Sequence, residues 1–258
     1  MTRLQTEFRR LYLPRATAAA VTDPDQDGLI DGQGEVRALV LELARPADWE
    51  LLSRVWKGVQ TDLDLPAPAI AVSGTDGLQL WFSLSEPPGL APALAFLDAL
   101  RCRYLPEVAA PRVRLLPEVD AAGMPVRHAR PVPALDERTG NWSAFVAPDL
   151  APLFAETPWL DLPPGDDGQA SLLGRLASID PPAFAAALAR LQPSAPPAPA
   201  VHPIPAPVDP DPAPTSRPPG AAPSEPERFL LAVMNDETVP LALRIEAARA
   251  LLPRRADR

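Results

Sequence analysis

The prolines of this chain are concentrated in one segment, and that concentration limits where a folded core can form. Of the 37 prolines in 258 residues, 14 lie between Pro193 and Pro226. Because proline lacks a backbone N–H and the segment has almost no large apolar side chain, we expect an extended, disordered Pro-rich linker. The linker, residues 193–226, separates a body, residues 1–192, from a short C-terminal piece, residues 227–258.

The net charge of the chain argues against some classes of binding partner. The net charge is −9, which argues against a protein that binds nucleic acid or an anionic membrane surface non-specifically. A local basic patch remains compatible with it. The one cysteine, Cys102, excludes a disulfide within the chain. No apolar run approaches the length of a membrane-spanning helix and no apolar leader opens the chain, so we expect a cytoplasmic protein that does not contact membranes.

Apolar periodicity in the body predicts an α/β (α+β) fold, a mixed sheet with flanking helices. The expected strands are Val36–Leu43, the two arms of a hairpin over Ala69–Phe82, Arg112–Leu116 and Asn141–Val146. One helix should open at Pro46–Trp49 and end at Asp62–Pro66. Further helices are expected over Leu90–Tyr104, near Leu150–Phe154, and over Gly168–Ile179 and Pro182–Leu191.

The hairpin turn Ser73–Gly77 carries the strongest functional signal. It holds two glycines, which permit positive φ, and the hydroxyls of Ser73 and Thr75. Such a turn presents N–H groups and hydroxyls around a small concavity that can hold a phosphate. The alternative is an ordinary β-turn without a ligand, since Ser-Gly and Asp-Gly are common turn dipeptides.

The order strand, helix, strand, Ser-Gly-x-x-Gly-x-Gln, strand resembles the archaeo-eukaryotic primase/polymerase superfamily, above all the polymerase domains attached to bacterial end-joining ligases. The resemblance covers residues 36–116. It implies that the turn binds the phosphates of a nucleotide and that carboxylates on the preceding strand hold Mg²⁺ or Mn²⁺. The residues it assigns to the nucleotide are Ser73, Gly74, Thr75, Gly77, Gln79 and Glu42.

Two departures from the family pattern bear on catalysis. Gln79 stands where the family has histidine. Glu42 is the only acid on the strand that carries two metal-binding acids in the family. Asp62 and Asp64 lie too close to Ser73 to replace the missing acid, and they suit the end of a helix. We therefore predict a catalytically degenerate, nucleotide- or nucleic-acid-binding module of mobile-element or phage DNA metabolism. An active nucleotidyltransferase with unusual motifs is an alternative.

A second group of basic residues follows the turn in the sequence. Arg112 and Arg114 alternate on one expected strand and should face the same side, with Arg127, His128 and Arg130 nearby. Together they predict a small phosphate-contacting patch. Alternatively, they are solvated side chains.

An acidic stretch near the N-terminus resembles a calcium-binding loop. Its acids are Asp23, Asp25, Asp27 and Asp31, at the first, third, fifth and ninth positions of an EF-hand-type loop, and Gly28 is at the sixth. The twelfth position is Gly34, where the loop needs a bidentate glutamate, and no exiting helix follows. This argues for an acidic surface loop rather than a calcium site.

The C-terminal piece reads as two short helices within residues 227–253. Its sequence is similar to a tail segment of phage small terminases. The apolar residues available to a partner are Leu230, Val233, Met234, Leu243, Ile245 and Leu251. A helical pair this small does not fold alone, so it either recruits a protein partner as a tethered adaptor, with no ligand needed, or packs on its own body.

Overall fold

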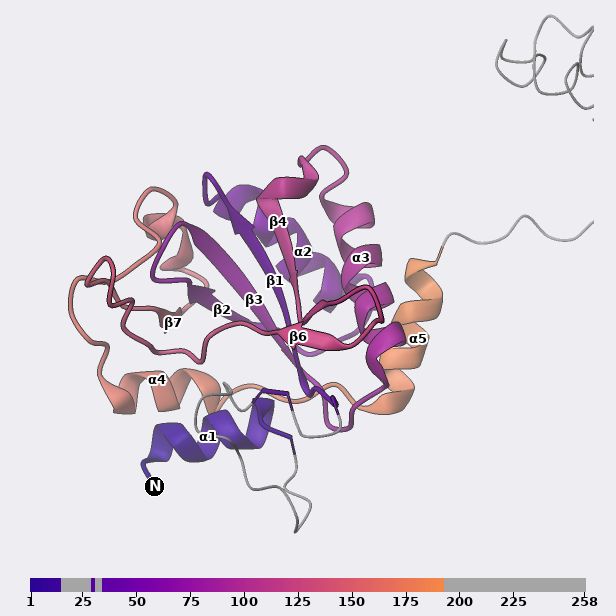
Figure 1. Cartoon of the computed structure of the whole chain (residues 1–258), viewed down its shortest axis with the longest axis horizontal. Coiled ribbons are helices and arrows are strands. Elements are labelled where there is room, and N and C mark those ends of the chain that lie inside the picture. Colours follow the sequence, from indigo (N-terminus) through magenta and orange to yellow (C-terminus); the bar gives the residue numbers. More distant parts are fainter. Residues whose placement is uncertain (15–28, 31–33, 193–258) are drawn as a thin grey trace, which may run out of the picture. The chain divides into compact units, whose positions relative to one another are not determined.

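The chain is described over residues 1–14, 29–30 and 34–192 by a computed structural model (Figure 1). Its main sheet has the strand order β4-β1-β3-β2-β7, and each pair of neighbours is antiparallel. These strands are β1 (Ala38–Ala44), β2 (Ala69–Val72), β3 (Gly77–Ser83), β4 (Val113–Leu116) and β7 (Ala144–Val146). Helices flank the sheet, so the predicted α+β class is confirmed.

The connections explain why no neighbours are parallel. Strands β1 and β2 run in the same direction and are joined by α2 (Trp49–Thr61), but β3 lies between them and runs the opposite way. Strands β3 and β4 are likewise joined by α3 (Leu90–Tyr104), with β1 between them. The body is thus built from two interlocked split βαβ units, and each crossover produces parallel strands that are never adjacent.

One face of the sheet is covered by three helices. Alternate side chains of β1, Leu39 to Leu43, pack in a buried cluster with apolar residues of α2, α3 and α5 (Pro181–Leu191). The cluster also takes Leu78, Leu80 and Phe82 from β3. Burial of this apolar surface supplies the main driving force for folding of the body.

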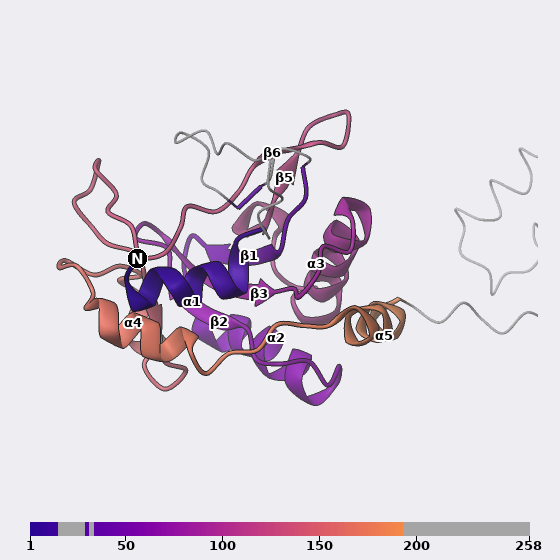
Figure 2. The same cartoon turned by 90° about the horizontal axis from the view of Figure 1, so that it is seen from below.

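The other face is covered over only part of its area. Helices α1 (Arg3–Tyr12) and α4 (Asp166–Leu173) lie side by side in both views (Figures 1 and 2) and contribute to a second buried cluster. Its centre is aromatic: the Trp81 ring from β3 lies 5.2 Å from Tyr12 and 5.9 Å from Phe145, centroid to centroid. The rest of this face is polar and forms the site described below.

A side chain protects the edge of the sheet at β7. Gln169 of α4 accepts a hydrogen bond from the Phe145 N–H (2.7 Å) and donates one to the Phe145 carbonyl (2.9 Å). The amide thus takes the place of a neighbouring strand at this residue, which leaves fewer open backbone groups at the edge.

Several predicted boundaries shift. The expected strand at Arg112 begins one residue later, because Arg112 ends a 3₁₀ helix, η1 (Ala110–Arg112). The helix expected to reach Ile179 is shorter: α4 stops before Gly174, and Ile179 instead exchanges backbone hydrogen bonds with Ser83 and Ser85. The helix near residue 150 is a 3₁₀ turn, η2 (Ala151–Phe154). A two-stranded sheet of β5 (Glu118–Val119) and β6 (Pro125–Arg127) was not expected from the sequence.

Some of the predictions fall outside the described residues. These are the acidic loop with Asp23, Asp25, Asp27 and Asp31, the linker 193–226, and the C-terminal piece with its six apolar residues. They stay predictions. None of the described helices has the length and apolarity that a membrane crossing requires.

Candidate functional site: a polar pocket on the sheet

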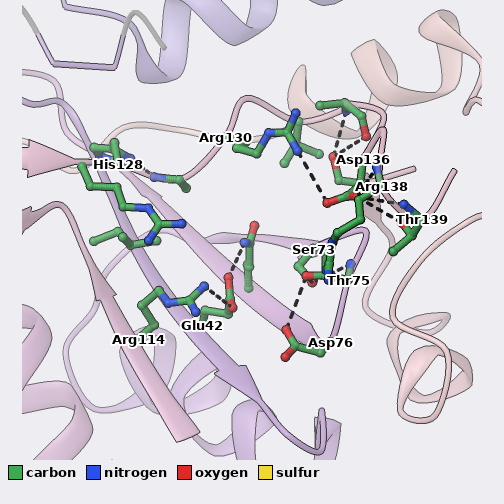
Figure 3. Close-up of a pocket in the computed structure, with 17 residues that line it drawn as sticks. Glu42, Ser73, Thr75, Asp76, Arg114, His128, Arg130, Asp136, Arg138 and Thr139 are labelled. Carbon is green, nitrogen blue, oxygen red and sulfur yellow. Dashed lines mark hydrogen bonds and ion pairs between the residues drawn. The ribbon is translucent and has the colours of Figure 1, made fainter. Parts of the chain in front are cut away.

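A pocket of about 730 Å³ lies over the polar part of the second face (Figure 3). Its floor is made by β1, β3 and β4, which contribute Glu42, Gln79 and Arg114. One wall is the hairpin turn between β2 and β3, and the other is the chain from Arg127 to Ser143. The volume falls within the range of small-molecule sites.

The floor residues form a continuous hydrogen-bonded chain. Glu42 stands opposite Gln79 on one side and Arg114 on the other in the sheet register. Its Oε2 accepts from Gln79 Nε2 (2.6 Å), and its Oε1 accepts from Arg114 Nη1 (3.1 Å). Gln79 Oε1 accepts from Trp81 Nε1 (2.8 Å). Glu42 is 2% exposed, and its carboxylate is therefore paired with Arg114 and hydrogen-bonded by Gln79 from the two neighbouring strands.

Gly77 makes room for that carboxylate. A Cβ at Gly77 would lie 2.9 Å from Glu42 Cγ and 3.1 Å from Ala44 Cβ. Of the two glycines in the turn, only Gly74 adopts positive φ (+79°). Gly77 is thus required by the space that Glu42 occupies, and it does not use the positive φ that a glycine permits.

The hairpin turn is closed by its own serine. Ser73 Oγ accepts from the N–H groups of Thr75 (3.1 Å) and Gly77 (3.0 Å) and lies 3.0 Å from Thr75 Oγ1. The Ser73 N–H bonds to the Gly77 carbonyl, and the Gly74 N–H bonds to the Pro158 carbonyl. These four N–H groups are satisfied within the protein. What the turn offers the pocket is the hydroxyl of Thr75 and the carboxylate of Asp76.

The opposite wall is organised by Asp136. Its Oδ1 accepts from the N–H groups of Arg138 (3.0 Å) and Thr139 (3.1 Å), and its Oδ2 lies 3.6 Å from Arg130 Nη1. The hydrogen bonds from Thr139 and Arg138 hold the pKa of the Asp136 carboxyl below its usual range. Figure 3 shows Arg138 reaching toward Thr75, so the two walls meet at that end of the pocket.

His128 is buried at the other end of this wall. Its Nδ1 accepts from the Ala129 N–H (2.8 Å), which leaves Nε2 to donate to the Ala38 carbonyl (2.9 Å). Burial lowers the pKa of the ring to about 4. The ring is therefore neutral at pH 7 and joins this wall to strand β1; it is not a solvated or phosphate-contacting cation.

The structure thus gathers several of the predicted site residues in one place. Glu42, Ser73, Thr75, Gln79 and Arg114 all line the pocket, whereas Gly74 and Gly77 of the turn are not among its lining residues. Arg112 does not share a face with Arg114, because it belongs to η1 and donates to the carbonyls of Ala44 (3.4 Å) and Pro46 (2.8 Å).

Sequence reasoning missed the turn that carries Arg138 and Thr139. A signal for it was present: Asp136 followed by Thr139 and Gly140 is typical of a turn in which an aspartate side chain caps the backbone. Nothing local indicated that this turn would lie beside Thr75.

The floor does not fit a divalent metal ion. A two-metal site needs several carboxylates with free oxygens, whereas both Glu42 oxygens here are taken by Gln79 and Arg114. Within the described residues, no three acidic, histidine or cysteine side chains gather as metal ligands would.

Comparison with known proteins adds no relatives. The chain matches no protein-family model and no curated protein.

Proposed function

We propose that this protein binds a phosphate-bearing ligand, a nucleotide or a nucleic-acid segment, in the polar pocket and does not transform it. One observation carries the proposal: four arginines, Arg114, Arg127, Arg130 and Arg138, outnumber the three carboxylates that line the same hydroxyl-bearing pocket, in a chain whose net charge is −9. Guanidinium groups match phosphate oxygens in geometry and charge, and local basic clusters attract anions even on acidic proteins.

The topology and the sequence motif support the nucleotide as ligand. The split βαβ order leaves part of one sheet face free of helices, and the Ser73–Gln79 motif of the primase/polymerase resemblance borders that part. Thr75 is partly exposed at this border, and its hydroxyl donates to Asp76 Oδ1 at 3.4 Å, a long hydrogen bond that a phosphate oxygen can replace.

The floor supports binding without phosphoryl transfer. Its carboxylate, Glu42, is held by two donors, and Gln79 uses its amide for Glu42 and Trp81. Because Arg114 already pairs with it, Glu42 could bind a divalent ion only in competition with that guanidinium group.

Calorimetric titration of the full chain with dATP and with a 5′-phosphorylated oligonucleotide, at low and high salt, tests the proposal. The double variant Arg127→Gln/Arg138→Gln should weaken binding at least tenfold at low salt, and Thr75→Val a few-fold, because each removes donors that face the anion. Arg9→Gln is the matched control: Arg9 is exposed on α1, away from the pocket lining, and makes no hydrogen bond or ion pair with the described residues.

Two results would contradict the proposal. Absence of binding at low salt, or equal binding by Arg127→Gln/Arg138→Gln and the unmodified chain, would remove the pocket as a phosphate site. Template-dependent primer extension with Mn²⁺ would restore the active nucleotidyltransferase as the better reading.

A further inference from the structure

The four arginines of the pocket differ in whether protein carboxylates already neutralise them. Arg114 bonds to Glu42 and lies 3.8 Å from Glu118, and Arg130 pairs with Asp136. The guanidinium groups of Arg127 and Arg138 make no hydrogen bond or ion pair within residues 1–14, 29–30 and 34–192, although the charge of Arg138 helps to lower the pKa of Asp136. An arriving anion therefore finds at these two residues guanidinium N–H groups from which no described carboxylate accepts.

The two unmatched arginines arise from opposite ends of the pocket. Arg127 ends β6 and immediately precedes His128, whereas Arg138 lies in the Asp136 turn beside Thr75. Figure 3 shows His128 and Arg138 on opposite sides, with Glu42 and Ser73 between them.

Both backbones are anchored from within. The buried His128 ring, bonded to Ala38, fixes the chain next to Arg127, and three hydrogen bonds from Arg138 and Thr139 to Asp136 fix the other turn. Because these backbones are already fixed, less conformational entropy is lost when a ligand binds to these two residues.

The floor between them disfavours a negative group. At the centre the Glu42 carboxylate and Gln79 Oε1 present acceptor oxygens, which oppose a phosphate and suit a neutral group with hydroxyl donors, such as a sugar. A neutral part of the ligand is favoured over the centre.

Building on the proposed phosphate site, we infer that the ligand carries two phosphate groups separated by a neutral sugar, one bound by Arg127 and one by Arg138. Two sources supply this chemistry: a free nucleoside 3′,5′-bisphosphate, and an internal nucleotide of a single strand. A 5′-diphosphate has similar charge, but its phosphates are adjacent and reach only one end of the pocket.

The test compares thymidine 5′-monophosphate, 5′-diphosphate and 3′,5′-bisphosphate by calorimetry on the full chain. The bisphosphate should bind about tenfold more tightly than the diphosphate, since only it engages both guanidinium groups. Arg127→Gln and Arg138→Gln should each remove about that tenfold gain, whereas Arg9→Gln should preserve it. A short oligothymidylate, measured in parallel, distinguishes a strand from the free bisphosphate as the tighter source.

Both substituted residues are exposed, and a thermal melt of each variant checks that the fold is kept. Equal binding of the diphosphate and the bisphosphate, or a loss caused by only one of the two substitutions, would overturn the two-phosphate inference while leaving a pocket that binds phosphate. Failure of all three thymidine ligands and the oligothymidylate to bind would overturn the inference and the proposed function together.

Discussion

The two parts of the second sheet face show how one strand can serve both a core and a site. On β3, Trp81 and Gln79 are two residues apart and point to the same side. Trp81 is covered by α1 and packs among aromatic rings, whereas Gln79 lies on the floor of the pocket. A hydrogen bond from Trp81 Nε1 to Gln79 Oε1 joins them. The aromatic cluster therefore helps to position the pocket floor, because the buried Trp81 ring fixes the orientation of the Gln79 amide.

The largest loss of stability should come from removing Trp81, the centre of the aromatic cluster. Trp81 is fully buried, so Trp81→Ala should lower the free energy of unfolding by about 3–5 kcal/mol through lost burial and a cavity. Gln79→Ala is the matched control on the same strand and face, and it should cost about 1–3 kcal/mol through unsatisfied partners. Urea denaturation measures both. Equal losses would show that the two parts of this face do not differ in their contribution to stability.

A pH effect of intermediate size should come from His128, which connects the pocket wall to β1. Its folded-state pKa of about 4 lies below the usual histidine pKa of 6.5, so the stabilisation from a neutral ring is present above pH 6.5 and is lost as the pH falls toward 4. Between pH 7 and pH 5 the unfolding free energy should fall by about 2 kcal/mol from this residue.

Urea titrations of the unmodified chain and of His128→Gln at the two pH values isolate that contribution by difference. A direct check is the NMR titration of the ring, with a His202→Gln variant assigning the signals. An apparent pKa near 6.5 for His128 would contradict the buried neutral state.

The smallest of the three effects tests the packing of the floor. Gly77→Ala should lower stability by about 1–3 kcal/mol, because the new methyl group meets Glu42 Cγ at 2.9 Å. In a Glu42→Ala background this cost should shrink, since the obstructing atoms are gone, although Ala44 still lies nearby. A double-mutant cycle measures the coupling. Additive effects would mean that Gly77 does not accommodate Glu42.

Much of the fold could be predicted because its elements carry local signals. Alternating and helical apolar periods indicated β1, the hairpin, α2 and α3, and Asp62 does cap the end of α2, as its place before Pro66 suggested. The shortened α4 and the late start of β4 were missed because Gly174 and the η1 turn end or delay these elements within otherwise apolar surroundings.

The site was predictable only in part. The turn at Ser73 and its neighbour Gln79 stood out as a motif, and Glu42 was singled out as the lone acid on its strand. That Gln79 would bond to Glu42 depends on the pairing of β1 with β3, which are 37 positions apart at these residues. The placement of the Asp136 turn beside Thr75 depends on an even more distant part of the chain.

The sequence by itself determined which segments of the body form strands and helices, because residue spacing sets which side chains share a face. It also determined the chemistry available to the site: hydroxyls in the turn, arginines after it and one acid on the first strand. Only the tertiary structure decided that Glu42 accepts hydrogen bonds from both neighbouring strands and that two of the pocket's four arginines make no hydrogen bond or ion pair with the described residues. It also decided that helices cover one part of the second face and leave the other open. The reason is physical: strand register and helix packing bring together groups distant in the sequence, and those contacts settle which charges are satisfied.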